Sequence, residues 1–236
     1  MADIEGAART GSPQQRVQML GQVTDLFLSA ADRLNENQIG VFDDILIRLI
    51  EGMEPRTLAQ LSATLAASGV SPRQVISELA YHDEACVAVP VLAKSGGLSD
   101  QDLIRIASAR GLPHLLAISG RAMLSEAVTD IVLKRGNSIV FHALANNTAA
   151  RFSEFGYATL IESTERDETL AHKLGLRADI PANRLCELLS KAPAVVLIRL
   201  IKAAAPEARA RISLAIQVIA EQASMQAGMK TRAAAI

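Results

Sequence analysis

Along most of the chain, apolar residues recur every three or four positions, which is the spacing of one face of a helix. In residues 12–34, the apolar positions Val17, Leu20, Val23, Phe27, Ala31 and Leu34 recur at intervals typical of one face of a helix. A second helix is predicted after the capping residue Asn35, and a third over residues 55–67. We expect these helices, within residues 12–69, to close one end of the fold, or alternatively to form a self-association surface.

From residue 70 onward the pattern repeats. Five segments begin with an apolar residue, then Ser or Pro, then a helical stretch; their second residues are Ser71, Ser99, Ser125, Ser153 and Pro181, spaced by 28, 26, 28 and 28 residues. A serine side chain can accept a hydrogen bond from an amide of the first helical turn, and proline suits the first helical position. Ser71 and Gln74 also match a capping box. Each of the five positions therefore predicts the start of a helix.

Each segment contains a second break about 11 to 14 residues later, which predicts a hairpin of two helices. The expected second helices start near Asp83, Gly111, Asn137, Asp167 and Pro193, and the two Asp and one Asn are expected to act as caps. We expect this second set of helices to be irregular or partly 3₁₀, because Pro90 and Pro113 fall within it.

A short hairpin cannot bury the apolar faces of both helices alone, so neighbouring hairpins must stack. The sequence therefore predicts an all-α fold: a right-handed α–α superhelix, or HEAT-like solenoid, of short helical hairpins with a period of about 27 residues. The expected divisions are a disordered N-terminus at 1–11, a helical cap at 12–69, five repeats at 70–205, and a C-terminal helix with a tail frayed from about Gln226 at 206–236. Leu103 and Leu160 are expected in the core.

The segments VAVPVLAKSGGLSDQDLIRIASARGLPHLLAISGR, HALANNTAARFS and LGLRADIP resemble an uncharacterised bacterial family, a domain of unknown function with short HEAT-like or leucine-rich-variant-like helical repeats. The resemblance extends over roughly residues 12–200. It implies a solenoid, and it implies no activity, cofactor or catalytic residue.

Composition limits the classes of partner. Only 3% of the residues are aromatic and none is Trp, so few rings are available for stacking on bases. Residues 1–98 carry 7 basic and 12 acidic side chains, and residues 99–236 carry 17 and 13. A charge of +4 over the second part is weak for a nucleic-acid surface, whereas the asymmetry favours head-to-tail contacts or a partner with charge on one side.

The N-terminal residues lack the pattern of a signal peptide, and even the most apolar stretch is interrupted by Arg199 and Lys202. Cys86 and Cys186 lie a hundred residues apart, which favours two buried thiols in a reducing compartment. We therefore expect a cytoplasmic protein without a membrane partner.

The four histidines, His82, His114, His142 and His172, recur at intervals of 32, 28 and 30 residues. In a stack they would lie in successive layers about 8–10 Å apart, too far for shared zinc ligation at about 2.1 Å. No nucleophile elbow and no glycine-rich phosphate loop occurs in the sequence. We therefore expect no metal, no cofactor and no catalytic residue.

Arg121, Asn147 and Arg177 recur near the ends of the second helices. They can bond the last carbonyls of a neighbouring helix or reach a cap such as Asp130 or Asp179, or alternatively present a surface for an anion or a partner's carboxylates. The residues for which we predict partner binding are Arg121, His142, Asn147, Arg151, His172 and Arg177.

The sequence thus favours a non-catalytic scaffold that binds a partner protein or a second copy of itself. The alternative is weak nucleic-acid binding by Arg105, Arg110, Lys134, Arg135 and Arg151. A third option, a hydrolase or lyase, would require a concave pocket that holds a buried carboxylate near His142 or His172.

Overall fold

The computed structural model describes residues 12–68 and 72–233, with side chains described up to residue 226, and within these ranges the chain is all-helical. The N-terminal region contains α2 (Pro13–Ala30), the 3₁₀ turn η1 (Ala31–Arg33), α3 (Glu36–Ile50) and α4 (Pro55–Ala66). The described residues include no named strand, and one isolated parallel bridge joins Leu124 to Ala150. None of the helices described is long and apolar enough to cross a bilayer.

Short helices in pairs make up the rest of the chain. They are α5 (Arg73–Ala80) and α6 (Ala85–Lys94), α7 (Asp100–Ala109) and α8 (Leu112–Ser119), α9 (Glu126–Arg135) and α10 (Ser138–Asn146), α11 (Glu154–Ser163) and α12 (Glu168–Gly175), with η2 (Thr164–Arg166) between them, and α13 (Ala182–Lys191) and α14 (Ala194–Ala203). The last helix, α15 (Pro206–Ala233), is 28 residues long.

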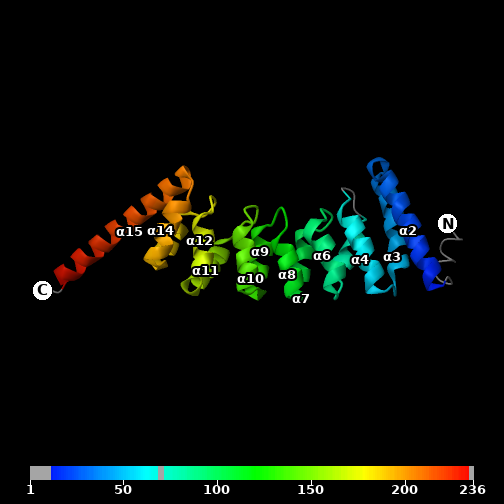
Figure 1. Cartoon of the computed structure of the whole chain (residues 1–236), viewed down its shortest axis with the longest axis horizontal. Helices are drawn as coiled ribbons and strands as arrows, with labels where there is room; N and C mark the ends of the chain where they lie inside the picture. The colour runs from blue at the N-terminus through cyan, green and yellow to red at the C-terminus, as the bar shows by residue number, and fades with distance from the viewer. Residues whose placement is uncertain (1–11, 69–71, 234–236) are drawn as a thin grey trace.

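From α4 onward the helices form two rows, because α4 and each of α6 to α13 pack against the helix two positions further along the chain. The A row contains α7, α9, α11, α13 and α15; the B row contains α4, α6, α8, α10, α12 and α14. In Figure 1 the pairs follow one another in chain order along the long axis, and α15 points away from α14 toward the C-terminus. The core is therefore a continuous layer between the rows, and Leu103 and Leu160 lie in it, 2% and 0% exposed.

Most helix starts lie where the local sequence predicts them. Ser99, Ser125 and Ser153 each accept a hydrogen bond from a first-turn amide of α7, α9 and α11. Asn137 and Asp167 cap α10 and α12 in the same way. These predictions are confirmed because a capping side chain acts on amides only two or three residues away.

Two predicted caps differ from the structure. Asp83 does not cap α6, which begins after Glu84 without a capping side chain, and Asp83 instead pairs with Arg110. Ser71 lies outside the described residues. The amides of Gln74 and Val75, at the start of α5, donate to the buried carboxylate of Asp43 at 2.8 and 2.9 Å. A side chain 32 residues before Val75 thus supplies the cap, and it ties α5 to α3.

Two further expectations, irregular second helices and buried cysteines, are wrong. The second helices are regular: Pro90 lies inside α6, Pro113 falls in the first turn of α8, and neither 3₁₀ turn of the described chain belongs to the B row. The helix α15 is described to Ala233, and the expected fraying from about Gln226 stays a prediction. Cys86 is exposed rather than buried, and Cys186 is only partly buried, with its thiol 3.9 Å from the Ala215 carbonyl of α15. The expected disordered segment, 1–11, lies outside the described residues.

Candidate functional site

The outer side of the B row carries few charged side chains. At the second and fifth positions of α6, α8, α10, α12 and α14 the side chains are exposed or half-exposed, and we call these ten residues the B-face: Cys86, Val89, Pro113, Leu116, Ile139, His142, Thr169, His172, Val195 and Ile198. Ile139 and Ile198 are 58% and 54% exposed. Because the five helices pack one on the next, equivalent positions are neighbours, and the B-face is a continuous strip without a carboxylate.

The outer side of the A row has the opposite character. Arg184 of α13 bonds Glu154 of α11 at 2.6 Å and Glu187 of its own helix at 2.6 Å. Lys191 lies 3.4 Å from Glu187 and 3.8 Å from Glu165. Ion pairs with water on one side are typical of a solvated surface. At α11 and α13 the A row therefore presents ion pairs, whereas the B row presents the weakly polar B-face.

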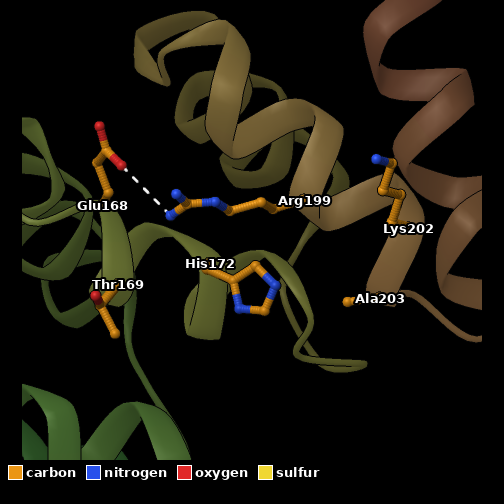
Figure 2. Close-up of a pocket in the computed structure, with 6 residues that line it drawn as sticks. All are labelled: Glu168, Thr169, His172, Arg199, Lys202 and Ala203. Atoms are coloured by element: carbon orange, nitrogen blue, oxygen red, sulfur yellow. Dashed lines mark ion pairs between the residues drawn. The ribbon is translucent and has the colours of Figure 1, made fainter.

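A shallow open hollow of about 410 Å³ interrupts the B-face between α12 and α14. It is lined by Glu168, Thr169, His172, Arg199, Lys202 and Ala203. Figure 2 shows Arg199 extending from α14 toward Glu168, which lies 3.6 Å away, with the His172 ring beneath them in this view. Both members of the ion pair are about half exposed, at 61% and 49%. The predicted partner-binding residue His172 thus lies in a hollow with a surplus of positive charge.

Arg121, Asn147 and Arg177 share one structural role at the ends of the B helices. Arg121 donates to the carbonyls of Leu92 and Ser95 at 2.5 and 2.9 Å. Asn147 donates to those of Ser119 and Arg121 at 2.9 and 2.8 Å. These side chains satisfy the carbonyls that a helix leaves unpaired at its end. The prediction of bonds between hairpins is therefore confirmed, and their polar groups face the preceding hairpin.

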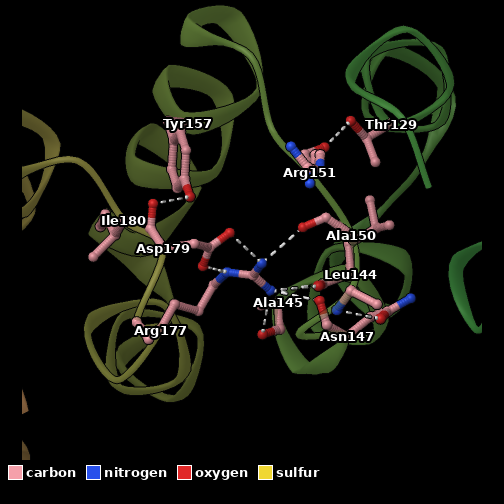
Figure 3. A network of polar contacts seen from close by, with 12 residues as sticks. Thr129, Leu144, Ala145, Asn147, Ala150, Arg151, Tyr157, Arg177, Asp179 and Ile180 are labelled. Atoms are coloured by element: carbon pink, nitrogen blue, oxygen red, sulfur yellow. Dashed lines mark hydrogen bonds and ion pairs between the residues drawn. The ribbon is translucent and has the colours of Figure 1, made fainter. Parts of the chain in front are cut away.

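Arg177 is the most enclosed of the three, at 4% exposed. It donates to the carbonyls of Asn147 at 2.6 Å and Ala150 at 2.8 Å, and more weakly to those of Leu144 and Ala145. Figure 3 shows its guanidinium between these carbonyls and the carboxylate of Asp179, which it meets at 2.8 Å. The Arg177 side chain is consequently a connector between hairpins.

The same network perturbs Tyr157. Its hydroxyl donates to the Asp179 carbonyl at 3.1 Å, and the ring packs edge-on against Phe152. Burial, and secondarily the charge of Asp179, raises the pKa of Tyr157 to about 12. The group is therefore a neutral donor near neutral pH.

Arg211, in the A-row helix α15, makes similar bonds to the loop between α12 and α13, and sequence reasoning missed it. Arg211 donates to the carbonyls of Ala178 and Ile180 at 2.6 and 2.5 Å. In the A row Arg135 donates to the carbonyls of Ala107 and Arg110. The spacing of 34 residues between Arg177 and Arg211 is the signal that could have pointed to this role.

His142 lies on the B-face and contacts the next hairpin. Its Nε2 lies 2.8 Å from Oδ2 of Asp167, which also accepts a bond from Ser138. Burial raises the pKa of Asp167, but bonds from the Leu170 amide, His142 and Ser138 outweigh it and lower the pKa below its usual value. The Ser138 hydroxyl bonds the carboxylate rather than the imidazole, so the three side chains do not form a serine–histidine–aspartate relay.

The remaining histidines have structural partners. His114, 3% exposed, bonds the His82 carbonyl at 2.9 Å through Nε2, and His82 accepts from the Glu84 amide. In the described region of the chain, no three His, Cys, Asp or Glu side chains gather in a way that could hold a metal ion. Arg151, the last predicted partner-binding residue, has an exposed side chain, and only its main chain is engaged, with Leu124 and Thr129.

The fold and these surfaces define an all-helical protein of stacked hairpins, joined by arginine and asparagine side chains at helix ends. A family model described as "Uncharacterised protein conserved in bacteria (DUF2336)" matches residues 87–236, and the chain belongs to this family. Neither a curated protein nor a solved structure matches the chain.

Proposed function

We propose that the chain is a right-handed α–α superhelix with a period of about 27 residues, and that it works as a non-catalytic, cytoplasmic scaffold that binds a protein partner on its B-face. The observation that carries the proposal is the composition of that strip: seven of its ten residues are aliphatic, Pro or Cys, and none is acidic. Covering exposed apolar side chains is favourable by roughly 25 cal/mol per Å², so such a strip favours association.

The regular architecture is supported by the bonds between hairpins. Arg121, Asn147, Arg177 and Arg211 each bond carbonyls 26 to 34 residues earlier, and three of these residues bond the backbone at or beside the previous one. Repeating one contact from hairpin to hairpin repeats one rotation, which generates a superhelix.

Nucleic-acid binding receives less support. Arg110 and Arg135, two of the five candidate residues, direct their guanidinium groups at carbonyls of the preceding hairpin. Arg105 and Lys134 lie over the rings of Tyr81 and Phe155. Because these cations already contact carbonyls and rings, fewer of them can contact phosphates than the number of basic residues in the sequence implies.

Position-specific photo-crosslinking tests the proposal. A photoreactive amino acid replaces Ile139 or Val195 on the B-face, or, as matched controls, Gln101 or Asn183 at the second positions of α7 and α13. All four residues are exposed, so none of the substitutions perturbs the core. We expect one discrete protein adduct from both B-face positions in the native cells and at most a trace from the A-row positions. Equal adducts from both rows, or none from the B-face, would refute the proposal.

A further inference from the structure

Positive charge gathers at one end of the B-face. The sixth residues of the B helices, next to the strip, are Pro90, Ala117, Ala143, Lys173 and Arg199. Only the sixth residues of α12 and α14, Lys173 and Arg199, are charged. Lys202 of α14 is a third cation nearby. At these sixth positions the B row therefore changes from uncharged at α6, α8 and α10 to basic at α12 and α14, although α6 carries the exposed Lys94 in its last turn.

The hollow between α12 and α14 gathers two of these three cations. Arg199 and Lys202 line it together with His172, and Glu168 is the one carboxylate in its lining. The pair between Arg199 and Glu168 is long, at 3.6 Å, and exposed to water, so it contributes little. An incoming carboxylate can therefore replace Glu168 as the partner of Arg199 at small cost.

We propose that the hollow binds carboxylate side chains of a protein partner, whose apolar residues cover α6, α8 and α10. This inference rests on the proposed function. It specifies a partner segment with apolar residues over α6 and acidic residues over α14. Five helices spaced by about 8–10 Å span about 35 Å, which an extended segment of about 11 residues covers.

An acidic protein segment fits this surface better than a nucleic acid. A nucleic acid carries a phosphate at every step, whereas the cations beside the B-face gather at α12 and α14, and only Lys94 at the end of α6 adds a Lys or Arg on the other three helices. None of the ten B-face residues is Phe, Tyr or Trp, so the strip offers no such ring for base stacking. The B-face residues of α6, α8 and α10 instead suit contact with apolar side chains of a protein partner.

Titration of the isotope-labelled full chain with hexaglutamate, followed by amide chemical shifts at physiological salt, tests the inference. We expect shifts confined to α12 and α14 around Thr169, His172, Arg199 and Lys202. The double variant Arg199→Glu with Lys202→Glu should weaken hexaglutamate binding at least tenfold. The matched control, Arg56→Glu with Arg73→Glu, makes the same charge change at exposed first-turn residues of α4 and α5 and should weaken it less than twofold.

Three results of the titration would overturn the inference: no shifts around the hollow, equal weakening by the control variant, or tighter binding of a six-nucleotide oligothymidylate, which would assign the hollow to phosphates. If the charge-reversed variant did not fold, Arg199→Gln with Lys202→Gln would take its place. The proposed function is tested separately, by the crosslinking experiment. Should the crosslink at Ile139 form undiminished in the charge-reversed variant, the scaffold proposal stands and the acidic-partner inference falls.

Discussion

Replacing Arg177 by alanine tests whether arginines join the hairpins. The side chain is 4% exposed, and its two shortest bonds to carbonyls reach those of Asn147 and Ala150 at 2.6 and 2.8 Å. A hydrogen bond from a charged donor contributes about 1.5–3 kcal/mol, so the two together contribute about 3–6 kcal/mol. Asp179 is 44% exposed and regains water, which lowers the loss. We expect Arg177→Ala to reduce the free energy of unfolding by about 3–5 kcal/mol.

Urea unfolding, followed by circular dichroism, measures this loss. Arg151→Ala is the control, because its exposed side chain has no role in the stack, and it should change stability by less than about 0.5 kcal/mol. Arg177→Lys should fall between them, since an ammonium keeps the charge but cannot reproduce the fork of donors. Hydrogen exchange should speed up first in α10 and α12, the helices on either side. A loss below about 1 kcal/mol for Arg177→Ala would refute the connecting role.

Three further predictions follow from the core and from the titratable groups. Leu103→Ala and Leu160→Ala should each cost about 2–5 kcal/mol in thermal melts because both side chains are fully enclosed; unchanged melting would mean that the A row is assigned incorrectly. The fold lowers the pKa of Asp167, so the carboxylate stabilises the fold above its unfolded pKa, and this stabilisation is lost as pH falls through its folded pKa. The difference in free energy of unfolding between the native chain and Asp167→Asn should therefore become smaller in acid. A difference independent of pH would contradict the bonds described for Asp167. Absorbance titration should show one tyrosine ionising at about pH 12 and lost in Tyr157→Phe; no such tyrosine would mean that Tyr157 is not enclosed.

Local chemistry made the helix starts predictable. Ser99, Ser125 and Ser153 act on amides within three residues, so their role is visible in the sequence. The cap that Asp43 supplies to α5 was not predictable, because it depends on two helices meeting in space. The exposure of Cys86 was missed because the spacing of the two cysteines bears on their pairing and not on which face of a helix a neighbour covers.

The candidate site was only partly predictable. The recurrence of Arg121, Asn147 and Arg177 indicated a shared role, and bonding between hairpins was one of the two interpretations. The B-face was not anticipated, because Ile139 and Ile198 look like core residues in a helical pattern. Their exposure follows from their place at the second and fifth positions, which point away from the A row.

The most direct test of the account is to place charge on the B-face without changing the fold. Cys86 is exposed and can carry a photoreactive maleimide in a Cys186→Ala background. Ile139→Asp with Ile198→Asp should abolish the adduct from Cys86 and leave the urea midpoint unchanged, because both side chains are more than half exposed. The control Gln101→Asp with Asn183→Asp, on the A row, should keep the adduct. An adduct that survives both aspartates on the B-face would contradict the claim that this strip binds the partner.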